Sequence, residues 1–479
     1  MPIHVMVPRS IESVVARSAA TFPAVGIVGP RQSGKSSLVQ SLFPRHKLAI
    51  LESPDILRAA QQDPRAFLNS FDAAEGAVLD EIQRAPELMS YLLEYIDRDL
   101  RFGRRMGRWI LTGSESLLLS QRITQSLAGR IAMHEVLPMS SLELAAFPRR
   151  RGDPQSSLLR SVIQGGYPAL FAERPDRRTW FDAYVTTYIE RDVRNILRIG
   201  DLAAFQRFLT LCAGRTGQLL NLAQLGADAA IAQSTARAWM SVLEATYIVK
   251  LVPGWFGNIS KRLVKAPKLH FVDTGLACAL LGISDEIVLD THPLRGPLVE
   301  SWFAGELLKA QAARGLRSRI FHWRDQNAAE ADLVVDVAGK LTVIEVKSAM
   351  TVHRDWARSL ERMTSALPAG TAVERVIVHG GGDDMPPLTG TTLVPWAQAG
   401  EFAARVFAEG AGNPPATKPV TKPVKATLAA KTPSPAKPVS NAKQSAPPKK
   451  AGRGAKVTSA AKGTRSTKAP KSAKKPRRA

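Results

Sequence analysis

The chain has 479 residues, of which 45% are hydrophobic, and this composition allows about two to four folded units with sizeable cores. Its formal net charge of +23 comes mostly from the C-terminal end, because residues 411–479 hold 18 of the 65 Lys and Arg residues and none of the 42 Asp and Glu residues. Two cysteines, Cys212 and Cys278, exclude a disulfide framework and a cysteine-rich zinc site, and they favour a cytoplasmic location. We expect neither a secretory signal nor a membrane-spanning helix, since no apolar run is long enough for either.

Residues 23–145 predict an α/β domain with a mainly parallel sheet, because short apolar runs alternate with helical periods. The apolar runs include residues 24–28 and 108–111. Residues 155–250 are predicted to be mostly helical, and residues 290–400 return to α/β character.

A phosphate-binding loop is predicted at residues 29–36, which fit the pattern G-x-x-x-x-G-K-[ST] between a strand-like run and a helical run. In such a loop, backbone N–H groups and the N-terminus of the helix bind phosphate oxygens. Lys35 is expected to reach the β- and γ-phosphates of ATP, and Ser36 is expected to ligate Mg²⁺. The loop residues predicted to bind the nucleotide are Gly29, Pro30, Arg31, Gln32, Ser33, Gly34, Lys35, Ser36 and Ser37.

Two acidic residues, Asp80 and Glu81, end a later apolar run. Asp80 is expected to support Mg²⁺, directly or through water, and Glu81 is expected to polarise the attacking water. Another apolar run leads to Thr112 and Ser114, which are candidate sensors of the γ-phosphate, with a hydroxyl-capped turn as the alternative. Arg130 is a candidate for stabilising the transition state, in its own chain or in a neighbouring subunit, and is otherwise a surface arginine.

These segments resemble a large prokaryotic family of AAA-type ATPases whose C-terminal domain has been described only as a domain of unknown function. The segments that carry the resemblance are residues 29–38, 76–88, 110–114, 126–130, 165–168 (Gly-Gly-Tyr-Pro) and 188–192. The resemblance covers about residues 10–400 and implies ATP binding, with hydrolysis as a plausible activity.

Two helical runs at residues 219–226 and 232–243 fit a helix-turn-helix, and the run that follows them fits a wing. The polar residues near the start of the second run are Ser234, Thr235 and Arg237. Because this run is only mildly basic, a winged-helix unit that serves as an ATPase lid or a protein interface is the alternative. Downstream, His270 is interpreted as a packed strand residue, and Asp273 as a turn residue rather than a functional acid.

Residues 330–347 predict two strands joined by a two-residue turn at residues 338–339. In this register Asp332 lies opposite Glu345. Lys347 shares the face of Glu345, whereas the apolar neighbours of Glu345 take the other face, because side chains alternate along a strand.

Two facing carboxylates favour a cation between them, and Mg²⁺ or Mn²⁺ suits oxygen ligands. Glu300, at the start of a predicted amphipathic helix (residues 300–310), is a candidate third ligand beside Asp332 and Glu345, and Lys347 is a candidate catalytic group that orients or deprotonates water. This set resembles the core of PD-(D/E)XK nucleases. An inactive nuclease-like fold kept for binding and a surface hairpin with solvated charges remain the alternatives.

Residues 411–479 are rich in Lys, Ala and Pro and contain no aromatic residue, so we expect a disordered tail that binds polyanions without sequence preference. A solubilising extension is the alternative. The predicted domains are an AAA-type P-loop ATPase domain with a parallel sheet (1–150), a helical, winged-helix-like middle region (151–265), an α/β restriction-endonuclease-like, PD-(D/E)XK domain (266–408) and a basic tail (409–479).

The sequence therefore predicts an ATP- and Mg²⁺-dependent ATPase that couples its nucleotide state to DNA binding or processing by a nuclease-like domain. The alternative is an ATP-gated binding switch with an inactive nuclease-like fold. Nucleic acid is the expected partner, no membrane association is expected, and oligomerisation is left open.

Overall fold

The computed structural model describes residues 7–103, 106–114, 127–147, 156–189, 201–255, 266–317, 319–325, 329–382 and 387–408. All of these residues belong to one compact unit, which spans Met1–Ala416. The predicted tail at 409–479, Ser126 and the motif residues 190–192 lie outside the described residues. Within the described part of the chain, no helix combines the length and the apolar character needed to cross a membrane.

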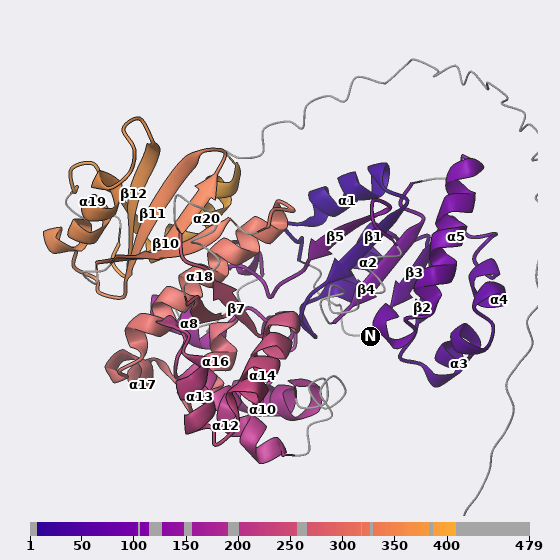
Figure 1. Cartoon of the computed structure of the whole chain (residues 1–479), viewed down its shortest axis with the longest axis horizontal. Helices are drawn as coiled ribbons and strands as arrows, with labels where there is room; N and C mark the ends of the chain where they lie inside the picture. The colour runs from indigo at the N-terminus through magenta and orange to yellow at the C-terminus, as the bar shows by residue number, and fades with distance from the viewer. Residues whose placement is uncertain are drawn as a thin grey trace, which may run out of the picture. The chain divides into compact units, whose positions relative to one another are not determined.

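The N-terminal part is a five-stranded parallel sheet with the strand order β2-β3-β4-β1-β5, as Figure 1 shows. Its strands are β1 (Ala24–Val28), β2 (Lys47–Ile50), β3 (Ala77–Asp80), β4 (Trp109–Gly113) and β5 (Ile131–Glu135). Every residue of β1 is buried, which fits a strand that has a neighbour on each side and a helical layer on each face. The predicted parallel α/β sheet is therefore confirmed.

Helices cover both faces of this sheet. The helices are α1 (Glu12–Thr21), α2 (Lys35–Leu42), α3 (Pro54–Gln62), α4 (Pro64–Asn69) and α5 (Leu88–Arg101). Val15 of α1 and Leu38 of α2 pack in one core with Val25 and Ile27 of β1. Buried residues of α3, α4 and α5 form a second core on the opposite face, so the sheet is a central layer between two helical layers.

The middle region is mostly helical, as predicted, and it carries a small antiparallel sheet of order β6-β8-β7. Its helices are α7 (Ser141–Leu144), α8 (Leu158–Gln164), α9 (Pro168–Ala172), α10 (Arg177–Tyr184), the π-helical turn η3 (Val185–Ile189), α12 (Leu202–Ala213), α13 (Leu222–Asp228) and α14 (Gln233–Ala245). Its strands are β6 (Gln218–Leu219), β7 (Val249–Val252) and β8 (Lys268–Phe271). Asn221 caps α13 by accepting a hydrogen bond from the N–H of Gln224, which sets the start of the first predicted helix of the pair.

The C-terminal part contains a mixed sheet of order β13-β12-β11-β10-β9, in which β9, β10 and β11 are antiparallel and β11, β12 and β13 are parallel. Its strands are β9 (Ile320–Arg324), β10 (Glu330–Val337), β11 (Lys340–Lys347), β12 (Ala372–His379) and β13 (Thr392–Pro395). Its helices are α16 (Thr274–Leu280), α17 (Glu286–Thr291), α18 (Arg295–Ala313), α19 (Arg358–Ser365) and α20 (Ala399–Ala408).

The two faces of the mixed sheet belong to different cores. Buried residues of α19 pack with Val343 of β11 on one face, whereas buried residues of α18 and α20 pack with Ile344 on the other. The same large core continues through α8, α12 and α14, so the predicted boundary at residue 265 falls within one continuous apolar interior.

The prediction of an amphipathic helix at residues 300–310 is wrong in its bounds and in its amphipathic character. The helix α18 begins earlier, at Arg295, and every residue from Leu298 to Leu308 is buried. The polar residues of this stretch do not face water, because α18 packs against the mixed sheet, α20, α16 and β8 at once.

Candidate functional site

The backbone of the predicted phosphate loop leaves the buried strand β1 and enters α2 through a tight turn. Gln32 and Gly34 both have left-handed backbone angles, with φ of 63° and 92°. Gly29 cannot be replaced without a shift, since a Cβ atom there would lie 2.0 Å from the carbonyl oxygen of Val136. The sequence therefore forms the predicted curled loop at the carboxyl end of a central strand, where it meets a helix N-terminus.

Lys35 lies inside this loop and is only 6% exposed. Its Nζ donates hydrogen bonds to the carbonyl oxygens of Gly29 at 2.9 Å and Pro30 at 2.8 Å. The loop thus holds a buried positive charge at the position that the motif assigns to the phosphates of ATP.

Residues from three neighbouring segments meet beside Lys35. The hydroxyl of Ser36 lies 3.5 Å from both carboxylate oxygens of Asp80, and the hydroxyl of Thr112 also contacts Asp80. The Thr112 hydroxyl accepts a hydrogen bond from the backbone N–H of Glu81 at 3.2 Å. Ser36, Asp80 and Thr112 therefore converge as predicted, and an oxygen pair from Ser36 and Asp80 fits the ligand preference of Mg²⁺.

The carboxylate of Glu81 is held by its own neighbours. It accepts a hydrogen bond from the Ser114 hydroxyl at 2.9 Å and contacts the amide of Gln83. Burial raises the pKa of Glu81, but the charges of Lys35 and Arg31 and these hydrogen bonds outweigh that effect, so the pKa lies below its usual value. Burial raises the pKa of the adjacent Asp80, although the Thr112 hydrogen bond opposes it.

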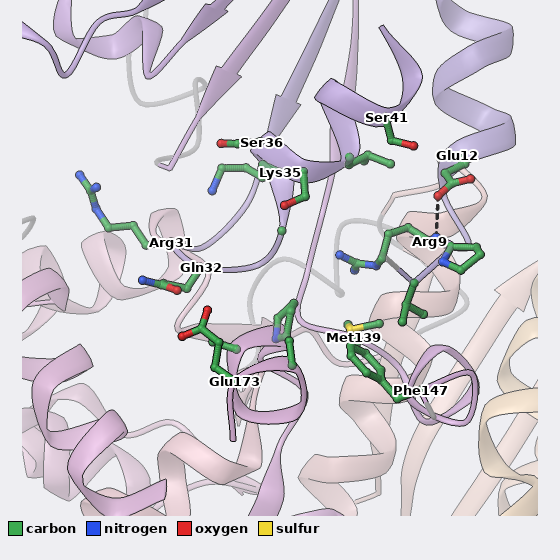
Figure 2. A pocket seen from close by; sticks show the side chains of 18 of the residues that line it. Arg9, Glu12, Arg31, Gln32, Lys35, Ser36, Ser41, Met139, Phe147 and Glu173 are labelled. Atoms are coloured by element: carbon green, nitrogen blue, oxygen red, sulfur yellow. Dashed lines mark hydrogen bonds between the residues drawn. The ribbon is translucent and has the colours of Figure 1, made fainter. Parts of the chain in front are cut away.

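A cavity of about 550 Å³ opens beside the loop (Figure 2). From the predicted set it is lined by Arg31, Gln32, Gly34, Lys35, Ser36, Ser37 and Glu81. It is also lined by residues that the motif does not include, among them Arg9, Glu12, Met139, Phe147, Pro168 and Glu173. The volume and the mixture of charged and apolar walls suit a nucleotide whose phosphates lie at the loop.

Arg9 joins the loop to the segment that follows the sheet. Its guanidinium donates to the carbonyl oxygens of Ser33 and Leu137, each at 2.7 Å, and forms an ion pair with Glu143 at 3.1 Å. In Figure 2 the Arg9 side chain lies between the loop and Met139. Arg9 is therefore a part of the site that the sequence motif does not reveal.

A chain of contacts runs from the phosphate loop into the middle region. The hydroxyl of Tyr184 donates to the carbonyl oxygen of Arg31 at 3.3 Å, and the hydroxyl of Tyr167 donates to that of Tyr184 at 3.1 Å. The backbone N–H of Gly166 donates to the Asp273 carboxylate at 2.7 Å. Asp273 also caps α16, so the segment around Gly166 connects the loop with the helix that opens the C-terminal half.

Asp273 is fully buried and close to Gly165. A Cβ atom on Gly165 would lie 2.3 Å from Asp273 Oδ1, and the φ of Gly165 is 68°. Asp273 is thus a helix cap, in agreement with its interpretation as a turn residue, and it also fixes a second segment. His270 is a packed strand residue, as expected, and its Nδ1 lies 3.0 Å from the Ser301 hydroxyl.

The predicted hairpin of β10 and β11 is confirmed, including its register. Val337 pairs with Lys340 and Leu333 pairs with Ile344, so Asp332 and Glu345 follow at the next position. Glu345 and Lys347 contact each other, and Asp332 accepts a hydrogen bond from the N–H of Val346 at 2.8 Å. Burial and the nearby Asp332 raise the pKa of Glu345 to about 7, although Lys347 opposes the shift.

Lys268 of β8 occupies the space between the predicted metal ligands. Its Nζ lies 2.9 Å from Glu300 Oε1 and 3.5 Å from Asp332 Oδ1, and it also contacts Glu330. Among the described residues, no group of three or more His, Cys, Asp and Glu side chains has an arrangement that could hold a metal ion. The prediction of a metal site at Glu300, Asp332 and Glu345 does not fit this structure, because a lysine ammonium lies within 4 Å of both Glu300 and Asp332.

Comparisons with known proteins agree with the N-terminal geometry. A family model described as an AAA domain matches residues 21–145, and models described as domains of unknown function, DUF8612 and DUF4143, match residues 155–287 and 295–399. The uncharacterized protein Rv2008c of Mycobacterium tuberculosis is 31% identical over 391 residues, which cover 80% of this chain and 82% of that protein. The uncharacterized protein Mb2031c of Mycobacterium bovis matches to the same extent.

This chain belongs to their family of AAA-type P-loop ATPases. Among solved structures, the Walker-type ATPase paby2304 of Pyrococcus abyssi is 16% identical, with 57% of this chain and 96% of that chain covered and a TM-score of 0.41. The RuvB Holliday junction branch migration motor of Thermotoga maritima is 17% identical, with 51% and 86% covered and a TM-score of 0.26. TM-scores this low add nothing to the family assignment.

Arg130 of this AAA-type ATPase does not lie at the nucleotide site of its own chain. It precedes β5, whose first residue pairs with Ala24 at the start of β1, whereas the phosphate loop follows the end of β1. The Arg130 guanidinium forms an ion pair with Asp97 at 2.6 Å. Arg130 therefore lies at the opposite end of the strands from the phosphate loop, and a role in the nucleotide site of a neighbouring subunit stays a prediction.

The predicted helix-turn-helix corresponds to α13 and α14. Ser234 and Arg237 are exposed on α14, and Thr235 is half-buried. These polar side chains are accessible, whereas Trp239 and Met240 of the same helix are packed into the core. A role for α14 in contacting nucleic acid stays a prediction.

Proposed function

We propose that the chain hydrolyses ATP with Mg²⁺ and uses its nucleotide state to control what the C-terminal half binds. Lys35 would bind the β- and γ-phosphates, Ser36 and Asp80 would hold Mg²⁺, and Thr112 would sense the γ-phosphate. Mg²⁺ would neutralise charge that develops on the phosphates. Glu81 would accept a proton from the attacking water, and its lowered pKa keeps it ionised for that role.

The observation that carries this proposal is the contact of Tyr184 with the phosphate loop. A hydroxyl of the middle region bonds directly to the carbonyl of Arg31, so a change of loop conformation on nucleotide binding alters that bond. Tyr184 bonds to Tyr167, which is next to Gly166, and Gly166 is bonded to Asp273 of the C-terminal half. The pathway is short and made of buried groups, which supports mechanical coupling.

We propose a nucleic acid as the partner. The order α12-β6-α13-α14-β7-β8, with its antiparallel sheet, supports a winged-helix interpretation of the middle region. The basic segment at 411–479 supplies 18 positive side chains without a negative one, which favours a polyanion. Binding without cleavage is favoured, since Lys268 lies where the divalent ion of a nuclease would bind.

DNA cleavage is a second candidate, and one observation favours it. Glu345 and Lys347 share a face of β11 beside Asp332, which is the arrangement expected of a PD-(D/E)XK centre. In this case Glu300, Asp332 and Glu345 would have to release their lysine partners before they could take Mg²⁺ or Mn²⁺.

The test is the affinity of the full chain for labelled single-stranded and duplex DNA, with and without Mg–ATP. Tyr184→Phe is the key variant, because it removes the hydroxyl bonded to the loop and keeps the ring, and Tyr91→Phe is the matched control on α5. We expect ATP to change DNA affinity in the unmodified protein and in Tyr91→Phe, but not in Tyr184→Phe or Lys35→Ala. An affinity that ATP leaves unchanged in the unmodified protein would contradict the proposal. Cleavage that Asp332→Ala abolishes would favour the second candidate.

A further inference from the structure

The side chain of Lys268 is buried in a place where an isolated charge would be costly. The residue is 2% exposed, and it lies on the central strand of the small sheet, paired with both β6 and β7. A lysine is almost never buried to this degree without partners. Its ammonium therefore has to be matched by charges close by.

The partners are carboxylates from two elements of the C-terminal half. Glu300 comes from α18, and Glu330 and Asp332 come from β10. Glu300 and Asp332 are themselves buried, with exposed fractions of 8% and 9%. One ammonium thus holds together acids that would otherwise repel one another.

The third acid of the predicted site is matched separately. Glu345 contacts Lys347 on its own strand. The residues predicted as one metal-binding set are therefore divided between two lysines. Mg²⁺ requires oxygen ligands at about 2.1 Å and Mn²⁺ prefers the same kind of ligand, so neither ion fits between Glu300 and Asp332 while the ammonium is there.

We propose that Lys268 is the resident cation of this acidic cluster and takes the place of a divalent metal ion in the C-terminal domain. The carboxyl groups then keep a fixed arrangement around the ammonium, and this arrangement needs no metal for its formation. This inference goes beyond the proposed function, because it holds for any partner and does not depend on ATP hydrolysis.

The experiment measures Mn²⁺ binding to the nucleotide-free full chain by electron paramagnetic resonance. Asp332→Asn keeps the oxygen that accepts the Val346 hydrogen bond, so it tests the cluster without deleting that bond. We expect the unmodified protein and Asp332→Asn to bind the same amount of Mn²⁺ with the same affinity. Any Mn²⁺ site of the unmodified protein that is lost in both Asp332→Asn and Glu300→Gln would overturn the proposal.

A second variant gives the positive result. Lys268→Met keeps an unbranched side chain and removes the charge, so it should create a Mn²⁺ site that is at least about tenfold tighter than any in the unmodified protein, because one nearby positive charge is removed. The double variant Lys268→Met/Asp332→Asn should lose that site. A folded Lys268→Met protein with unchanged Mn²⁺ affinity would contradict the proposal. If Lys268→Met does not fold, the comparison of the unmodified protein with Asp332→Asn still decides whether the acidic cluster binds Mn²⁺.

Discussion

Asp80 and Glu81 are neighbours at the end of β3, yet their surroundings shift their pKa values in opposite directions. Asp80 is paired mainly with hydroxyls, so burial dominates and raises its pKa. Burial also raises the pKa of Glu81, but the charges of Lys35 and Arg31 together with its hydrogen bonds outweigh burial and lower the pKa. This difference suits a metal-supporting acid beside an ionised base.

The first prediction concerns Glu81. Glu81→Gln should retain ATP binding and lower kcat by about 10²- to 10⁴-fold, as expected for loss of a general base. Because the pKa of Glu81 in the folded protein is lowered, its carboxylate is ionised above that value and becomes protonated only as the pH falls through it. We therefore expect kcat to stay level from about pH 8 down to about pH 5. A fall in kcat with an apparent pKa near neutrality would contradict this role.

The second prediction concerns Lys35. Lys35→Ala should lower ATP turnover by at least about 100-fold, because the variant lacks a preorganised charge at the phosphates. Ser41→Ala is the matched control, since Ser41 lines the same cavity further along α2 (Figure 2). Steady-state phosphate release measures the ATP turnover of both variants. Normal turnover in Lys35→Ala would contradict the assignment of residues 29–36 as a phosphate-binding loop.

Residues within a local motif were predictable, and residues brought in from a distance were not. The spacing of the loop predicted Lys35 and Ser36, and the strand endings predicted Asp80 and Thr112. Arg9 and Tyr184 carry no motif, since each acts by reaching a backbone carbonyl of a distant segment. The role of Lys268 could not be predicted, because the sequence around a lysine in an apolar strand does not indicate which distant carboxylates will contact it.

At the scale of elements, the hairpin of β10 and β11 shows how a turn determines which side chains lie opposite each other. Its two-residue turn requires a positive φ at both positions. The φ values are 51° at Ala338 and 83° at Gly339. The turn fixes the register, and the register places Asp332 beside the strand that bears Glu345. The alternation of side chains was therefore enough to predict this geometry.

The third prediction concerns the turn. Ala338→Asn should raise the free energy of unfolding by up to about 1 kcal/mol, because asparagine tolerates a left-handed backbone better than alanine does. Ala338→Val should lower it by a similar amount or more, since a β-branched side chain is disfavoured there. Ala338 is exposed, so packing should contribute little. Denaturant midpoints of the three proteins test this, and an Asn variant less stable than the Val variant would contradict it.

The helix α18 was harder to predict than the hairpin. Its polar residues suggested one face in water, whereas Glu300 and Glu306 are buried and bonded to groups of other elements. Glu306 accepts hydrogen bonds from the N–H and the hydroxyl of Ser141, which are distant in sequence. A sequence pattern shows which residues are polar, but it does not show which distant groups will form hydrogen bonds with them when they are buried.

At the scale of the whole molecule, one apolar core extends from α8 to α20. The predicted order of an α/β part, a helical part and a second α/β part is observed. The sequence could not predict that the last two parts share one core, because an apolar residue carries no indication of which distant residues it packs against. Because these two parts share one closely packed core, we expect a displacement of the middle part to move the C-terminal part with it.

The fourth prediction concerns the basic segment. Removal of residues 411–479 should weaken DNA binding and flatten its dependence on salt, because fewer counterions are released from the DNA. Filter binding or anisotropy over a series of salt concentrations measures the slope. An unchanged slope would show that these residues do not contact DNA.

The most direct test of the central claim is hydrogen exchange of the full chain with and without Mg–ATP. If nucleotide state reaches the C-terminal half, Mg–ATP should change exchange at residues 165–172 and in α16 as well as in the phosphate loop, and Lys35→Ala should remove all of these changes. Changes confined to the loop, α2 and β3 would show that the nucleotide site acts alone and would contradict the account.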